Sequence, residues 1–181
     1  MNRRLTMALV AVATLGVLAP AAGAAPKQNE IRITGGPIYK PGKMIGDNVR
    51  FNATTTVKSG GTVKVVNKGA VEAGPHTVTL LKKAALPTTM AKAEKCFEFK
   101  GACAPLAAAH QLNPETQEPA VPLYDAGGAG FDTMGDDDVA GDSAFFPPGQ
   151  GGSIKVSARK GSTLTYFCAV HPWMQGKISV K

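Results

Sequence analysis

The chain has 181 residues, of which 44% are hydrophobic and 18% are charged, so its composition is globular rather than disordered or collagen-like. Only 6% of the residues are aromatic, whereas 21 glycines and 13 prolines favour strands and turns over a helical bundle. The formal net charge is +7, but the basic residues are scattered and are not interleaved with aromatic residues. This pattern argues against a protein that binds nucleic acid.

The first 24 residues are typical of an export signal that is removed by cleavage. Arg3 and Arg4 precede an apolar run from Leu5 to Leu18, and Ala22-Gly23-Ala24 then supplies the small residues of a signal-peptidase site. The run is shorter than the roughly 18 residues that cross a bilayer, so we expect cleavage before Ala25 rather than an uncleaved anchor. The sequence therefore predicts a periplasmic or extracellular protein without a membrane span. The choice between general secretory and twin-arginine export stays open.

Alternating apolar and polar residues predict several short strands along the rest of the chain. Gly35-Gly36-Pro37 ends the first strand, and Ser59-Gly60-Gly61 makes a hairpin-like turn between the second and the third. His76 opens the fourth strand after the turn signal Ala73-Gly74-Pro75. The pattern predicts an all-β chain folded as a small antiparallel β-sandwich. The predicted strands are Ile31–Thr34, Val49–Val57, Thr62–Asn67, His76–Leu81, Ser153–Ser157, Ser162–Val170 and Lys177–Val180.

The strand spacing fails between Lys82 and Pro148. Residues Thr89–Lys95 favour a short helix there, whereas Asn113–Gly152 is rich in Pro, Gly and Asp. A connection of this length is unusual inside a compact domain, but it has too few periodic apolar residues for a core of its own. We therefore expect residues 25–181 to form a single domain with an insertion at about 82–148.

Charge is unevenly distributed along the chain. Between Gly101 and Ile154 there is no Lys or Arg, but there are eight acidic residues. Loss of Arg3 and Arg4 with the export signal leaves a formal charge of +5. Because the acidic stretch carries all of its eight negative charges without a Lys or Arg, the cleaved chain outside that stretch is strongly basic. This split either steers a charged partner or reflects a solvated acidic loop beside a basic surface.

The three cysteines need separate explanations. Cys96 and Cys103 lie seven positions apart within the insertion, and an exported protein favours a disulfide between them. Cys168 is then left over. An unpaired cysteine is often simply a small buried hydrophobic residue.

The residues after Cys168 favour a metal site instead. The run Cys168-Ala169-Val170-His171-Pro172-Trp173-Met174 brings a thiolate, an imidazole and a thioether together at the end of an apolar strand. His76 begins another strand, and two adjacent strands of a sandwich would bring its imidazole to the same end. Taken singly, Met174 could be core filler and His76 a buried histidine with ordinary hydrogen bonds. Taken together, two His, one Cys and one Met are the donor set of type 1 copper, whereas zinc prefers a thiolate or a harder ligand to a thioether.

These segments resemble the plastocyanin/azurin-like cupredoxin family. The resemblance rests on Gly74–Thr79, on Tyr166–Ile178 and on the strand pair Val57–Lys68, and the short Cys-x-x-His-x-x-Met loop is most similar to that of amicyanins. It implies a Greek-key sandwich and one copper ion held by His76, Cys168, His171 and Met174. Two departures stand out: Thr77 occupies a position where many members have Asn, and the insertion after Leu81 has no counterpart in the small members.

The resemblance implies a monomer that shuttles single electrons between transient redox partners, a donor and an acceptor. It places electron exit and partner docking at His171, Pro172 and Trp173. A copper carrier or storage protein would use the same ligands without redox cycling. An enzyme with Cys168 as a nucleophile is disfavoured because no oxyanion-binding device is recognisable, so we expect no enzymatic activity. His110, Met90 and Met134 could form a second metal site, but their scatter favours solvated loop residues.

Overall fold

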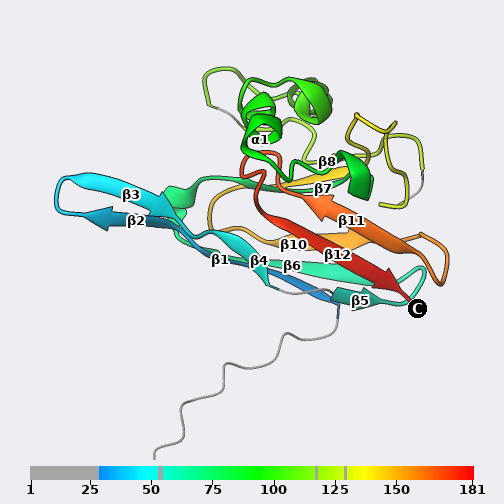
Figure 1. Cartoon of the computed structure of the whole chain (residues 1–181). Helices are drawn as coiled ribbons and strands as arrows, with labels where there is room; N and C mark the ends of the chain where they lie inside the picture. The colour runs from blue at the N-terminus through cyan, green and yellow to red at the C-terminus, as the bar shows by residue number, and fades with distance from the viewer. Residues whose placement is uncertain (1–28, 53–54, 117, 129) are drawn as a thin grey trace, which may run out of the picture.

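The computed structural model describes residues 29–52, 55–116, 118–128 and 130–181, so the expected export signal at residues 1–24 lies outside the described residues (Figure 1). Two β-sheets lie face to face, and a separate two-stranded hairpin projects from one end of them (Figure 1). The two facing sheets confirm the predicted β-sandwich.

The described part of the chain contains no helix that is long and apolar enough to span a membrane.

The first sheet has four strands and the second has six. In spatial order, the first contains β10 (Gly152–Lys155), β6 (Thr62–Gly69), β1 (Glu30–Gly35) and β4 (Arg50–Asn52). The second contains β5 (Thr55–Val57), β12 (Gln175–Val180), β11 (Thr163–Phe167), β7 (His76–Leu80), β9 (Ser143–Phe146) and β8 (Leu123–Tyr124). Most neighbours are antiparallel, but β1 runs parallel to β6 and β12 runs parallel to β5. Those two parallel pairs are a detail that strand patterning did not predict.

The core lies between the two sheets because successive side chains of a strand point to opposite faces. Ile31 and Ile33 of β1 and Leu164 and Tyr166 of β11 belong to one buried cluster, which also holds Cys168 and Met174. The ring of Phe51 meets the ring of Tyr166 edge-on, with 5.0 Å between their centroids. This packing fixes the two sheets against each other next to the end where the predicted ligands lie.

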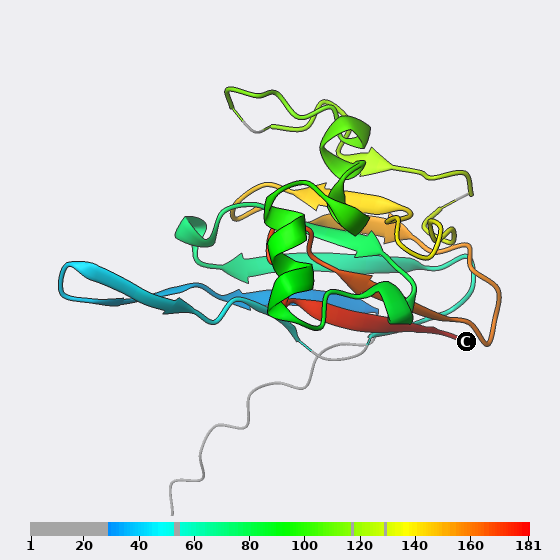
Figure 2. The same ribbon diagram turned by 45° about the horizontal axis from the view of Figure 1, so that its top comes forward.

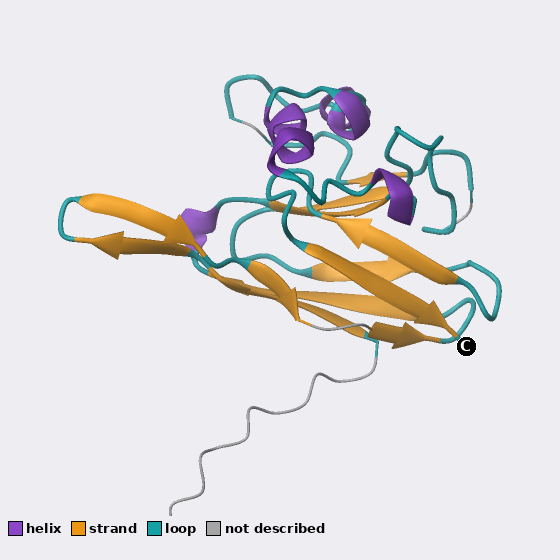
Figure 3. Ribbon diagram, in the orientation of Figure 1, coloured by secondary structure: helices purple, strands orange, loops and turns teal. Residues whose placement is uncertain are grey.

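The two α-helices lie over the outer face of the six-stranded sheet (Figure 3). Phe167 faces outward from β11 and packs in a second buried cluster with Leu81, Leu86 and Leu106. The helical elements are α1 (Met90–Phe97), α2 (Leu106–Ala109), and the 3₁₀ turns η1 (Val71–Ala73), η2 (Lys83–Ala85) and η3 (Gly101–Cys103). α1 matches the predicted helix, and Thr89 caps it by accepting a hydrogen bond from the Lys92 amide.

A disulfide joins Cys96 at the end of α1 to Cys103 in η3, and Cys168 is the free cysteine. This is the pairing expected from the spacing of the three cysteines. The disulfide lies in the second cluster and holds α1 against the turn that leads to α2. It therefore braces the layer that covers the sheet beside the predicted metal ligands.

Three elements differ from the sequence-based expectation. The turn at Ser59-Gly60-Gly61 does not close a hairpin, because β5 and β6 belong to different sheets and the chain crosses between them there. β9 falls within the range 82–148 yet is fully buried and pairs with β7 in the six-stranded sheet. The hairpin of β2 (Pro37–Lys40) and β3 (Lys43–Asp47) projects beyond the sandwich (Figure 2).

Candidate metal centre

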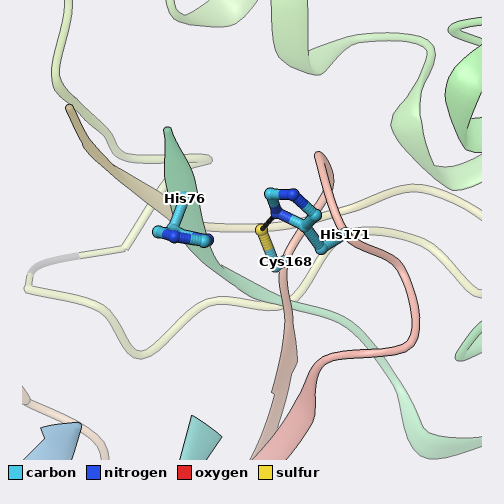
Figure 4. Close-up of side chains that lie close together, drawn as sticks. All are labelled: His76, Cys168 and His171. Atoms are coloured by element: carbon cyan, nitrogen blue, oxygen red, sulfur yellow. Dashed lines mark hydrogen bonds between the residues drawn. The ribbon is translucent and has the colours of Figure 1, made fainter. Parts of the chain in front are cut away.

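Three predicted ligands come together at one end of the sandwich (Figure 4). His76 is the first residue of β7, Cys168 follows β11, and His171 lies in the loop from β11 to β12. β7 and β11 are antiparallel neighbours, so the start of one lies beside the end of the other. Sheet topology, rather than proximity in sequence, therefore brings His76 to Cys168.

The ligand atoms of His76, Cys168 and His171 all lie within 4.8 Å of one another. Cys168 Sγ and His171 Nδ1 are 3.7 Å apart, close enough for both to bind one ion through bonds of about 2.3 Å to sulfur and 2.0 Å to nitrogen. The three side chains are positioned to form a metal site.

His76 supplies the test of whether a metal fits. Its side chain has no exposed surface, and neither ring nitrogen has a hydrogen-bond partner among the described residues. A buried imidazole without partners is costly, because it loses its bonds to water and gains none in return. A metal bound to a ring nitrogen would remove part of that cost, so the donor set and its burial fit a metal ion.

The charges of the site favour neutral imidazoles. Burial and, to a smaller extent, the nearby His171 together lower the pKa of His76 to about 4, while Asp47 acts in the opposite direction. Burial also lowers the pKa of His171, against Asp47 and a hydrogen bond with the Ala73 backbone. A metal ligand must offer a free lone pair, so both rings are ready to bind without first losing a proton at neutral pH.

Cys168 is held as a buried thiol when no metal is present. Burial raises its pKa, and the backbone amide and hydroxyl of Thr77 oppose that rise by hydrogen bonding. The Thr77 amide donates to Cys168 Sγ at 3.3 Å. The Thr77 hydroxyl accepts from the Ala169 amide at 2.8 Å. Thr77 thus links the two ligand segments through its backbone amide and its hydroxyl.

The ligand loop is closed by its own backbone. The Cys168 amide donates to the Met174 carbonyl at 3.0 Å, and the Met174 amide donates to the His171 carbonyl at 2.8 Å. Met174 is buried in the same cluster as Cys168. The loop therefore holds its thiol, imidazole and thioether residues in a compact turn.

Aromatic side chains surround His171. Its ring is buried, with 7% of the residue exposed, and meets Trp173 edge-on at 5.2 Å, whereas Trp173 is 47% exposed. The Trp173 indole donates to the Val49 carbonyl at 3.2 Å and lies 6.3 Å from the ring of Phe97. Sequence reasoning missed Asp47, Val49 and Phe97, because nothing in their local patterns shows that they lie beside the ligand loop.

The other predicted candidates do not assemble. His76, Cys168 and His171 form the one cluster of three His, Cys, Asp or Glu ligand groups within the described ranges. Met90 is 72% exposed on α1, and Met134 packs against the main core. The expectation that His110 is a solvated loop residue is wrong, since it is 1% exposed and both ring nitrogens have partners.

Comparison with solved structures finds blue copper proteins, whereas neither protein-family models nor curated proteins give a match. Amicyanin from Paracoccus versutus is 18% identical over 91% of this chain and 86% of its own, with a TM-score of 0.38. Auracyanin A from Chloroflexus aurantiacus is 18% identical over 84% of this chain and 98% of its own, with a TM-score of 0.41. Auracyanin B is 15% identical over 88% of this chain and 93% of its own, with a TM-score of 0.38.

The assignment of the site rests on the chain's own geometry. A buried His, Cys and His cluster stands at the end of a β-sandwich, with Met174 three residues after the second histidine. In its fold class and in the residues of its metal centre, the chain resembles the plastocyanin/azurin-like cupredoxins.

Proposed function

We propose that the protein is an exported type 1 copper protein that passes single electrons between redox partners. The observation that carries the proposal is the buried His76 ring, which has no hydrogen-bond partner within the described part of the chain and lies beside the Cys168 thiol and the His171 ring. Two imidazoles and one thiolate suit copper, and copper when bound supplies the one-electron couple between Cu(I) and Cu(II). We assign Met174 as the weak axial ligand.

The protein's contribution is to hold its ligands still. Cys168 and Met174 are buried in the main core, and backbone hydrogen bonds close the loop between them. Pro172 has a fixed φ angle and stiffens the same loop. Because the two oxidation states of copper prefer different geometries, ligands that cannot rearrange keep the energy of reorganisation low. This restraint favours rapid electron transfer over catalysis, which would need an open coordination position.

Electrons leave, in this proposal, through the surface at His171, Pro172 and Trp173. Trp173 contacts the His171 ring and is the exposed member of the three. A carrier has to release its partner quickly, and weak redox encounters bury less than about 1,200 Å². A small contact centred on Trp173 meets that need.

The proposed location is outside the cytoplasm. A disulfide between Cys96 and Cys103 persists best in an oxidising compartment. The same pairing leaves Cys168 as the thiol available to copper. We propose that residues 1–24 are removed on export and that residues 25–181 act as one domain.

Copper titration tests the function. The purified chain given Cu(II) should become intensely blue through charge transfer from the Cys168 thiolate, and Cys168→Ser should lose both the colour and tight binding. The double variant Cys96→Ser/Cys103→Ser is the matched control, because it removes two sulfurs and keeps Cys168. A colourless complex of the native chain would exclude type 1 copper, and tight copper binding without reversible oxidation would identify a copper carrier or storage protein.

A further inference from the structure

His110 joins the helical layer to the sheet through a buried pair of hydrogen bonds. It follows α2, and its Nδ1 atom lies 2.6 Å from the Val121 carbonyl while its Nε2 atom lies 2.8 Å from Ser143 Oγ. A carbonyl oxygen can only accept, so Nδ1 carries a hydrogen. The state of Nε2 then decides whether the ring donates to Ser143 or accepts from it.

A chain of hydroxyl groups runs from Ser143 to the metal ligands. Ser143 Oγ and Thr79 Oγ1 are 2.7 Å apart, and Thr79 donates to Thr77 Oγ1 at 2.9 Å. Thr77 in turn accepts from the Ala169 amide at its hydroxyl, and the same hydroxyl acts on the Cys168 thiol, whose pKa it lowers. Thr77 and Thr79 are two positions apart on β7 and share a face, and Ser143 is the register partner of Thr79 on β9. All three hydroxyls are buried.

The hydrogens in this row of hydroxyl groups can be counted, because each hydroxyl donates one hydrogen. Thr79 gives its hydrogen to Thr77, so Ser143 has to donate to Thr79, and His110 Nε2 has to donate to Ser143. In this arrangement the Thr77 hydrogen remains available to Cys168. When Nε2 has no hydrogen, Ser143 donates to the ring, Thr79 donates to Ser143, and Thr77 becomes the donor to Thr79.

We propose that His110 is a positioning residue for the Cys168 ligand, and that the hydrogen on its Nε2 atom sets, through Ser143 and Thr79, the direction of the Thr77 hydroxyl. This inference rests on the proposed copper function. A hydrogen bond to the sulfur stabilises the state with more negative charge on it, which is the reduced site. The reduction potential should therefore be higher when Nε2 carries a hydrogen.

Charged side chains on the elements packed around His110 do not shift the pKa of its ring. Among the described residues, only burial and the Val121 hydrogen bond move the pKa of His110, the first lowering it and the second raising it. Asp142 precedes Ser143 on the chain, but its carboxylate accepts from the Ala126 and Thr133 amides. The charged side chains of the segments around α2 are exposed, namely Lys92, Glu94, Lys95, Glu98, Lys100, Glu115 and Glu118.

The pH profile of the reduction potential tests the proposal. At a fixed ambient potential, protonation of His110 should raise the ratio of reduced to oxidised copper by about fivefold, or about 40 mV at 59 mV per tenfold. Thr79→Val, which removes one hydroxyl at nearly constant volume, should abolish this step, and Thr79→Ser should restore it. Val121→Ala keeps the carbonyl that His110 needs and should retain the step.

Two outcomes would overturn the proposal. If the step survives Thr79→Val but vanishes in His110→Phe, the charge of His110 acts through space and the hydroxyl chain has no role. If it survives both variants, another group is responsible. The metal-free protein gives an independent readout, since ring-nitrogen NMR should show that Ser143→Ala lowers the pKa at which His110 Nε2 gains its hydrogen. An unchanged pKa would contradict the hydrogen-bonded connection between His110 and the hydroxyl groups. Failure to bind copper would contradict only the proposed function.

Discussion

At the residue scale, the environment of His76 differs strongly from water. It is fully buried, and its pKa falls from 6.5 to about 4 in the folded chain. Between these two values the unfolded chain binds a proton that the folded chain does not. The free energy of unfolding of the metal-free protein therefore rises with pH across this window. The contribution of His76 to it is lost as pH falls from about 6.5 to 4.

We expect His76 to contribute about 2 kcal/mol to that change, a discounted value for a shift of this size at about 1.4 kcal/mol per unit. Urea unfolding at several pH values measures it. His76→Phe has a ring of similar size that cannot be protonated, so its stability should depend less steeply on pH. An equally steep dependence in that variant would assign the effect to other groups, such as His110 and His171, whose pKa values burial also lowers.

We expect Met174 to affect the reduction potential of the copper more than the affinity for copper. Met174→Leu replaces the weak axial donor with a hydrocarbon side chain, and a more apolar site disfavours the more highly charged Cu(II), so the reduction potential should rise while copper affinity changes little. Redox titration and copper competition measure the two quantities. Met134→Leu is the matched control, since Met134 packs against the same core as Met174. An unchanged potential in Met174→Leu would show that the thioether is not a ligand.

At the scale of elements, Gly176 lets β12 and β11 pack closely. Gly176 is the register partner of Tyr166, and a Cβ atom added to it would lie 2.3 Å from Tyr166 Cζ. The Tyr166 ring is fully buried between the sheets and cannot move aside. Gly176→Ala should therefore destabilise the fold by about 1–3 kcal/mol.

Gly46 in β3 provides the control for that prediction. A Cβ atom there would have nothing within 4 Å, so Gly46→Ala should be neutral or slightly stabilising. Thermal or urea unfolding of both variants separates crowding from the general effect of replacing glycine in a strand. Equal effects of the two substitutions would contradict the close contact with Tyr166.

The sequence predicted those parts of the fold that local pattern determines. Strand alternation located β1, β6, β7, β11 and β12, and the sulfur and nitrogen residues that follow the apolar end of β11 located Cys168 and His171 of the site. β9 escaped because Ser143–Phe146 lies among Pro, Gly and Asp residues and is buried on both faces, so it shows no alternation. His110 escaped for a different reason: its partner Ser143 is 33 positions away, and only the folded sheet brings the two together.

At the scale of the whole molecule, exposed aromatic residues gather beside the ligand loop. Trp173 is 47% exposed and lies beside Phe97, which is 51% exposed, while Phe99, 57% exposed, lines a cavity together with Phe97, Ala169 and Val170. We expect Trp173→Ala to slow electron self-exchange about fivefold or more, since truncating a central aromatic contact costs about 1 kcal/mol or more. The blue absorption should change little, because Trp173 is not a ligand.

NMR line broadening of mixed oxidised and reduced protein measures this exchange at several salt concentrations. Leu123→Ala on β8 is the control, because Leu123 is equally exposed but belongs to the edge strand of the six-stranded sheet. Added salt should speed the exchange between two copies of a chain with a large net charge, since it screens their repulsion. A native rate in Trp173→Ala would place the exit elsewhere.

The burial of Cys168 also bears on how long the chain survives before it meets its metal. A thiol reacts with peroxide or with foreign disulfides as the thiolate, and Cys168 is both inaccessible and held protonated by burial. The other two cysteines, Cys96 and Cys103, are already joined to each other. The newly folded chain is thus chemically quiet in an oxidising environment, and it can wait for copper without being consumed by side reactions.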